Sequence, residues 1–418
     1  MRLWTAIFVL LPLYLFTKVL SVAPHALANA ILLLRGSSRK HLIQQSDIYR
    51  RGEEFVANQQ LNGAFHFEET QIRSVIRYAI QREARWFPNI EHYRVCGARV
   101  NVVHEKPLNT TPNGQTVVLL HGNPSWSYMW RDIIPILTRE GHEVFALDWI
   151  GHGLSDKPTD PTIISFELHM RTLLALFEHF DIRDCCIVAH DWGGCVVTAC
   201  GPYMPLFTNP RIFLLNSFMP PRPYDIGLNC YALYMLWFLC TGIFNGFIPE
   251  WVVMRYMAPL ITADVARGYE APYIHQAVEI KASISRFAHI VPGFPDWFLD
   301  NLRNSKYWRL FEGLCGPAKF TNFNAQAQLA ERGHTVRRFW KSCSAGGWRA
   351  AVVFGNEDPL LRDFKGVLED TIDKNAQVSI AGNGWIAGVG HYPVEERPNT
   401  LKILSMSRRE EGLTENPQ

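Results

Sequence analysis

Residues 190–194 have the sequence HDWGG and lie between two apolar runs, residues 185–189 (CCIVA) and residues 195–199 (CVVTA). The first run has the composition of a buried strand, and the second can continue the chain as a helix. Because glycine has no Cβ, the two glycines permit a tight change of direction between them. The stretch therefore predicts a strand, a sharp turn and a helix, with Asp191 at the apex of the turn.

The side chain at this apex indicates the chemistry. A strand–turn–helix that exposes a reactive residue is the nucleophile elbow of α/β-hydrolases, in which serine commonly occupies the apex. A carboxylate there can displace a leaving group from carbon and form an ester on the enzyme, which water can hydrolyse. Serine attacking the same carbon would form an ether, which has no carbonyl carbon for water to attack. Asp191 thus favours alkyl transfer over acyl transfer.

The composition fits a large globular enzyme. The chain has 418 residues, of which 48% are hydrophobic, and a formal net charge of +2. This length suits one catalytic unit with an inserted cap, or two domains. No basic tract is present, so the sequence does not indicate a nucleic-acid partner. The nine cysteines are scattered without the spacing of zinc ligands, so we expect buried thiols and neither a metal nor an organic cofactor.

The N-terminus differs from the rest of the chain. Residues 3–20 are almost wholly apolar, and a second apolar stretch covers residues 22–34. The first stretch has about the 20 residues needed to cross a hydrocarbon core. Small residues such as Ala26 and Ala28 leave a cleaved signal peptide open as the alternative. Since more arginines and lysines follow the stretch than precede it, we expect residues 1–34 to anchor a cytosol-facing catalytic part in a membrane.

Strand-like and helical segments alternate along the rest of the chain. Strands are predicted within residues 93–104, 115–120, 143–148, 185–190, 211–218, 349–355 and 377–381, and helices within residues 69–83, 127–139, 163–180 and 192–203. This alternation predicts an α/β fold with a mostly parallel sheet covered by helices. We expect a linker or lead-in at 35–90, a hydrolase core at 91–218 and 342–418, and a helical cap at 219–341.

A carboxylate nucleophile needs a base that activates water in the second step. Residues 388–393 (GVGHYP) follow the last predicted strand, and His391 is thus last in chain order, the usual position of the catalytic base in this fold. Asp358 follows the predicted strand at 349–355 and can orient the imidazole. The other position for an orienting acid, residues 216–218 (NSF), contains none, which favours Asp358.

Residues 119–128 (LLHGNPSWSY) contribute a third group of candidates. They follow a predicted strand and begin a helix, so the backbone N–H groups of Asn123 and Trp192 are predicted to form an oxyanion hole. The Asn123 amide and the Trp192 indole are also hydrogen-bond donors. Two such donors can hold a departing anion that needs no proton, and a halide fits this description.

These motifs resemble those of the haloalkane dehalogenases over roughly residues 90–410. Asn123 is the more specific match, because the elbow is shared with epoxide hydrolases. The resemblance implies the subgroup with an Asp–His–Asp triad of Asp191, His391 and Asp358 and an Asn–Trp halide site. A second subgroup has a cap tryptophan, where this chain has Met257. The resemblance further implies hydrolysis of a small halogenated alkane by water, without a cofactor.

Two other functions remain open. An epoxide hydrolase could use the same triad together with acidic hydroxyls from the cap, for which the candidates are Tyr231, Tyr234, Tyr256, Tyr269 and Tyr273. A pair of tyrosines facing Asp191 would favour this function. The other alternative is a non-catalytic, membrane-tethered ligand-binding protein with a hydrolase fold, although ligand binding alone would not require all three triad residues.

Overall fold

The computed structural model describes residues 64–79, 88–108, 115–204, 210–220, 249–274, 276–291 and 335–397, together with isolated positions between 225 and 248. The predicted membrane segment, residues 1–34, lies outside these ranges, as does the first part of the lead-in. Within these ranges, no helix has the length and apolar character that a membrane crossing requires.

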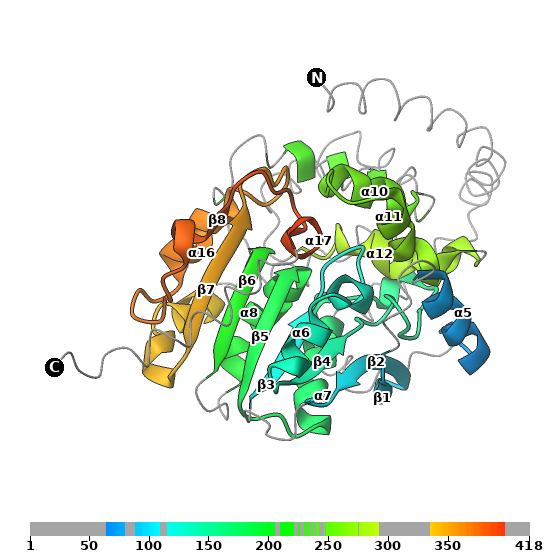
Figure 1. Cartoon of the computed structure of the whole chain (residues 1–418), viewed down its shortest axis with the longest axis horizontal. Helices are drawn as coiled ribbons and strands as arrows, with labels where there is room; N and C mark the ends of the chain where they lie inside the picture. The colour runs from blue at the N-terminus through cyan, green and yellow to red at the C-terminus, as the bar shows by residue number, and fades with distance from the viewer. Residues whose placement is uncertain are drawn as a thin grey trace, which may run out of the picture.

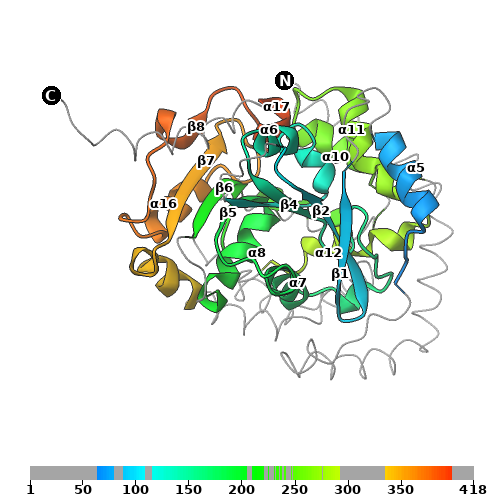
Figure 2. The same ribbon diagram turned by 60° about the horizontal axis from the view of Figure 1, so that its bottom comes forward.

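A central sheet forms the core of the molecule. Its strands are β1 (Ile90–Val95), β2 (Ala98–Glu105), β3 (Thr116–Leu120), β4 (Glu143–Leu147), β5 (Cys185–Asp191), β6 (Arg211–Ser217), β7 (Arg349–Gly355) and β8 (Trp385–Ile386). Their order is β1-β2-β4-β3-β5-β6-β7-β8. Figure 2 labels these strands with the exception of β3. Only β1–β2 and β2–β4 pair antiparallel. The predicted mostly parallel sheet is confirmed.

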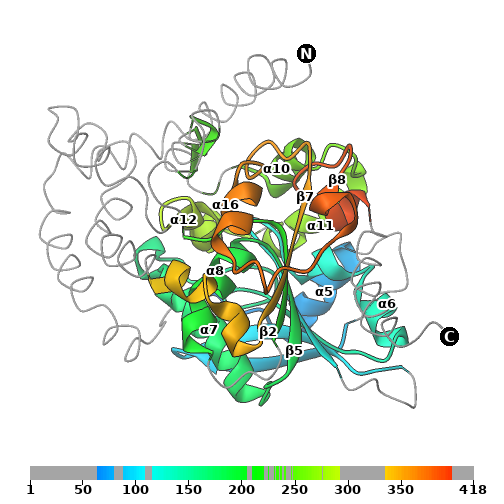
Figure 3. The ribbon, with the colours of Figure 1, turned by 90° about the vertical axis from the view of Figure 1, so that its left-hand side faces the viewer.

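Helices cover both faces of this sheet. The helices α7 (Phe166–His179), α8 (Trp192–Cys200) and α16 (Phe364–Thr371) lie on one face, and α6 (Ile134–Arg139) lies on the other (Figure 3). Every residue of β5 is buried, as the uninterrupted apolar run 185–189 predicts for a strand covered on both faces. Cys185, Cys186 and Cys195 are buried free thiols, as expected.

Further helices lie between β6 and β7 in the sequence. They are α10 (Glu250–Met257), α11 (Ala263–Glu270) and α12 (Ala282–Phe287), and they stand beyond the carboxyl ends of β5 and β6 (Figure 1). The short helix α17 (Pro393–Glu396) follows His391 and lies beside them in the same view. The helix α5 (Glu69–Ala79) contacts α11, so this part of the predicted lead-in packs on the main body.

Two predicted elements are wrong in detail. The helix predicted at 127–139 is a 3-10 turn, η3 (Ser127–Trp130), followed by α6. The strand predicted at 377–381 makes only one isolated bridge, from Gln377 to Ala350, and β8 begins later, at Trp385. Both segments are short, and a short apolar run does not distinguish helix, turn and strand.

Candidate active site

Asp191 lies where β5 ends and α8 begins. Its φ of 51° and ψ of −119° are unusual for a residue with a side chain. Small residues make this turn possible. A Cβ at Gly122 would lie 2.3 Å from Asp191 Oδ1, and a Cβ at Gly194 would lie 1.7 Å from Ser217 Oγ. The backbone is therefore held in a strained conformation by close packing, as the HDWGG stretch predicts for an elbow.

The Asp191 carboxylate has two distinct oxygen environments. The backbone N–H of Asn123 donates to Oδ1 at 3.0 Å. The other oxygen, Oδ2, lies 3.5 Å from His391 Nε2. The main-chain carbonyl of Asp191 accepts a hydrogen bond from Ser217 Oγ at 2.8 Å, which ties the elbow to β6. Oδ1 thus has a fixed backbone donor, whereas Oδ2 is the oxygen beside the imidazole.

The structure brings the three predicted triad residues together. His391 Nδ1 lies 2.9 Å from Asp358 Oδ2, and its Nε2 faces Asp191. Burial by itself lowers the pKa of His391, but the carboxylates of Asp358 and Asp191 more than offset this effect and raise the pKa to about 10. With both carboxylates ionised, the resting imidazole is therefore protonated at neutral pH.

Asp358 is fully enclosed by hydrogen-bond donors. Its Oδ1 accepts from the backbone N–H groups of Leu360 and Leu361 at 2.8 and 3.1 Å. Its Oδ2 accepts from Asn216 Nδ2 at 2.7 Å in addition to its contact with His391. Burial raises the pKa of Asp358, but His391 and these donors outweigh burial and lower it below its usual value. Asp358 is therefore suited to remain an anion beside the imidazole.

Several residues that the sequence did not single out hold the loop of His391. The ring of His190, the residue before Asp191, contacts the His391 carbonyl through Nε2 at 2.8 Å. The backbone N–H of His391 donates to the Met257 carbonyl at 2.9 Å, at the end of α10. Glu396 accepts from the backbone N–H of Gly390, and its other oxygen accepts from Leu260 N. The loop of His391 is thus held by contacts from the core and from the segment that ends α10.

Asn216 connects both parts of this arrangement. Its Nδ2 also donates to the Gly390 carbonyl at 3.2 Å, and its Oδ1 accepts from Gly355 N at 2.9 Å. The sequence identified this position only as one that lacks an acid. A neutral amide after a buried strand carries no distinctive signal, and its partners are 139 to 174 residues away in the chain.

Asn123, from the motif at residues 119–128, and Trp192, which directly follows Asp191, are both buried. Asn123 Nδ2 donates to the Ile284 carbonyl at 3.3 Å, and Oδ1 contacts His152 Nε2 at 3.0 Å. The Trp192 ring packs against Phe287 of α12, with ring centroids 4.7 Å apart. No acceptor for its indole N–H is found among the described residues. The part of the Trp192 backbone N–H in an oxyanion hole stays a prediction.

Three of the five tyrosines proposed for an epoxide hydrolase donate hydrogen bonds to groups other than Asp191. Tyr234 donates to the Ala288 carbonyl at 2.6 Å, Tyr269 donates to Glu395, and Tyr273 donates to the Gly151 carbonyl at 3.4 Å. Tyr231 lies outside the described residues. Met257 contributes its backbone carbonyl to the His391 loop. This arrangement does not favour an epoxide hydrolase.

Comparison with known proteins gives the same family likeness as the motifs. The family described as "alpha/beta hydrolase fold" matches residues 115–201. A haloalkane dehalogenase from Psychrobacter cryohalolentis is 28% identical over 202 residues, which are 47% of this chain and 62% of that protein. Haloalkane dehalogenase 1 from Mycobacterium tuberculosis is 30% identical over 184 residues, 43% of this chain and 58% of that protein. The matched part thus spans about three fifths of these relatives.

A solved structure extends the likeness to most of the chain. The haloalkane dehalogenase from Paraglaciecola agarilytica superposes with a TM-score of 0.59 at 21% identity, and the match covers 84% of this chain and 99% of that one. At this identity the superposition establishes the fold. The chain therefore has the α/β-hydrolase fold and is similar in sequence to haloalkane dehalogenases.

Proposed function

We propose that this protein hydrolyses carbon–halogen bonds of small halogenated alkanes. The observation that carries the proposal is the environment of Asp191: a backbone donor holds Oδ1, and Oδ2 lies 3.5 Å from His391 Nε2. This is the arrangement required for a carboxylate nucleophile and a base that acts after it. The similarity to haloalkane dehalogenases supports the halogenated substrate.

In the first step, Asp191 Oδ2 attacks the halogen-bearing carbon from the side opposite the halogen. A carbon–oxygen bond forms, the carbon–halogen bond breaks, and the halide leaves with the bonding electron pair. Asn123 Nδ2 and Trp192 Nε1 donate hydrogen bonds to the departing halide. Both are neutral donors in a buried site, where such bonds are stronger than in water.

In the second step, water hydrolyses the aspartyl ester. Esterification removes the negative charge of Asp191, one of the two carboxylates that raise the pKa of His391. The pKa of the imidazole therefore falls, His391 releases its proton to solvent, and the neutral imidazole can then accept a proton from water. The water oxygen attacks the ester carbonyl, whose oxygen Oδ1 is held by Asn123 N. The ester then breaks, the alcohol leaves with the second hydrogen of the water, and the Asp191 carboxylate and the protonated His391 are regenerated.

The test is halide release from a panel of brominated alkanes, measured beside diol formation from epoxides. We expect bromide and alcohol from the wild type. His391→Ala should accumulate an enzyme whose intact mass is raised by the alkyl group. Asp191→Asn is the control, because an amide cannot form this ester. Diol formation without bromide release, or continued turnover by His391→Ala, would contradict the proposal.

We further propose that the apolar residues 1–34 attach the catalytic unit to a membrane. The support is the length and composition of the segment. The measurement is fractionation of cells that express the full chain or a chain beginning at residue 35. The full chain should remain in the membrane pellet after alkaline carbonate washing, and the shortened chain should not. Equal release of both proteins would refute the attachment.

A further inference from the structure

A turn of sequence Gly-His-Gly at residues 151–153 follows β4 and presents His152 to the site. Both glycines have positive φ, 87° at Gly151 and 48° at Gly153. A Cβ at Gly151 would lie 2.1 Å from Ser283 Cβ, and one at Gly153 would lie 2.4 Å from Asp148 Cγ. No other residue fits at either position without a shift of its neighbours. The backbone on both sides of His152 is therefore tightly fixed.

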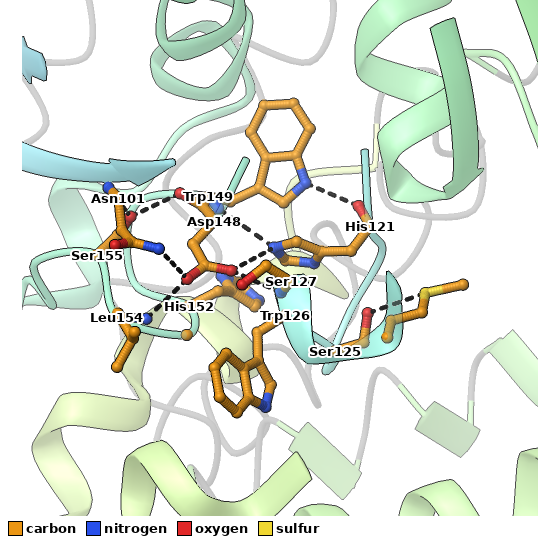
Figure 4. Close-up of polar contacts among 12 residues, drawn as sticks. Asn101, His121, Ser125, Trp126, Ser127, Asp148, Trp149, His152, Leu154 and Ser155 are labelled. Carbon is orange, nitrogen blue, oxygen red and sulfur yellow. Dashed lines mark hydrogen bonds and ion pairs between the residues drawn. The ribbon is translucent and has the colours of Figure 1, made fainter. Parts of the chain in front are cut away.

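The carboxylate of Asp148 supports this turn through hydrogen bonds to neighbouring segments (Figure 4). It accepts hydrogen bonds from Ser127 N at 2.6 Å, Asn101 Nδ2 at 2.8 Å and Leu154 N at 2.9 Å. These donors come from η3, from β2 and from Leu154, the residue directly after the turn. Because one buried carboxyl group joins three segments, the position of His152 is determined by contacts with the core.

The contacts of Asn123 assign its amide orientation and the tautomer of His152. The Ile284 carbonyl can only accept, so the end of the amide that faces it at 3.3 Å is Nδ2. The other end is then Oδ1, which also can only accept. It lies 3.0 Å from His152 Nε2, so Nε2 carries the hydrogen and donates it. One hydrogen of Nδ2 remains for a ligand.

His152 makes this contact as a neutral group. Burial lowers its pKa well below the ordinary value, and the neighbouring imidazoles of His121 and His169 act in the same direction. Its ring packs edge-on against Phe287, whose ring also contacts Trp192. His152 therefore adds a directed hydrogen bond beside the two predicted halide donors without adding a positive charge.

We propose that His152 is a positioning residue of the halide site, which it serves by holding the Asn123 amide with Nδ2 toward the ligand. This inference rests on the proposed function, since it assigns the halide to Asn123 and Trp192. Without the bond to Oδ1, the amide can rotate or flip about its side-chain torsion, and Nδ2 then no longer offers its free hydrogen in a fixed direction. The measurable consequence is weaker halide binding.

The experiment titrates three variants of the full chain with bromide. Binding is measured by the quenching of tryptophan fluorescence and by the inhibition of turnover. His152→Phe keeps an aromatic ring against Phe287 but removes the donor. His152→Gln restores an N–H near the place of Nε2. His169→Phe is the matched control: His169 is equally buried, packs on the same Phe287 ring at 4.5 Å, and has no partner for either ring nitrogen among the described residues.

We expect His152→Phe to bind bromide about tenfold more weakly, and His152→Gln to recover to within about threefold of the wild type, as for loss and recovery of one buried hydrogen bond. His169→Phe should bind bromide like the wild type. A bromide affinity of His152→Phe equal to that of the wild type would overturn the role of His152. So would bromide binding by His152→Gln or by His169→Phe that is as weak as that of His152→Phe. Bromide release by the wild type is measured separately: its absence would refute the proposed function, whereas the titration judges His152.

Discussion

The elbow of Asp191 and the loop of His391 reach the same site by different physical means. The elbow is enforced by exclusion, because Gly122 and Gly194 leave no space for a Cβ beside Asp191 and Ser217. The loop is held by hydrogen bonds that His190 and Asn216 donate to it and by one that the backbone N–H of His391 donates to the Met257 carbonyl. Packing resists any displacement, whereas each hydrogen bond can be removed singly. We therefore expect overpacking of the elbow to appear in stability, and removal of a single hydrogen bond from the loop to appear mainly in catalysis.

The charge of His391 should have the largest effect. Its pKa of about 10 in the folded protein exceeds the ordinary value of 6.5, so the folded state binds the proton more tightly. The resulting stability is fully present below pH 6.5 and is lost as the pH rises toward 10, by at most about 5 kcal/mol. The measurement is urea unfolding at pH 6.5 and 9.5 of the wild type and of His391→Gln.

The difference between the two proteins isolates this effect. Burial lowers the pKa of Lys157 to about 7, which acts in the opposite direction over the same range, but it acts equally in both proteins. The wild type should lose its advantage over His391→Gln as the pH rises. A constant difference would mean that the imidazole is not charged beside the two carboxylates.

Removal of one hydrogen-bonding side chain from the loop of His391 should have the second-largest effect. Asn216→Ala deletes the donor to Asp358 and to the Gly390 carbonyl. A hydrogen bond to a charged group contributes about 1.5–3 kcal/mol, so we expect the hydrolysis of the alkyl-enzyme to slow about 10- to 100-fold. The measurement is single-turnover kinetics, which separate formation of the ester from its hydrolysis.

A matched variant tests whether backbone strain alone explains the result. Asn216 has φ of 37°, and the exposed Asn383 has φ of 51°. Asn383→Ala carries a comparable backbone cost away from the triad and should leave both rates unchanged. If both variants slow hydrolysis equally, the contacts of Asn216 do not position the base.

The smallest effect concerns the packing of the elbow. Gly194→Ala places a Cβ against Ser217 Oγ, and such overpacking costs about 1–3 kcal/mol. Gly366→Ala on α16 is the control, because no atom lies within 4 Å of its Cβ and helices favour alanine over glycine. Urea unfolding should show destabilisation only for Gly194→Ala, with part of it relieved by Ser217→Ala. Equal stability of the two alanine variants would refute enforcement by packing.

The sequence predicted the elbow more completely than its surroundings. The uninterrupted apolar run and the two glycines indicated the strand and turn of Asp191, and the positions of His391 and Asp358 after predicted strands indicated where they would meet. The roles of Asn216 and His152 were not predicted. Each is a neutral polar side chain, and such groups acquire a role only from partners that are distant in the chain.

The sequence by itself determined the order of strands and helices, the carboxylate at the apex, and the residue types at the carboxyl edge of the sheet, because these depend on local apolar patterning and on side-chain chemistry. Tertiary structure alone decided which tyrosines were already engaged, which backbone carbonyls hold His391, and which way the Asn123 amide faces. These properties depend on the directions of hydrogen bonds between segments more than a hundred residues apart, and a linear pattern of residues does not specify such directions.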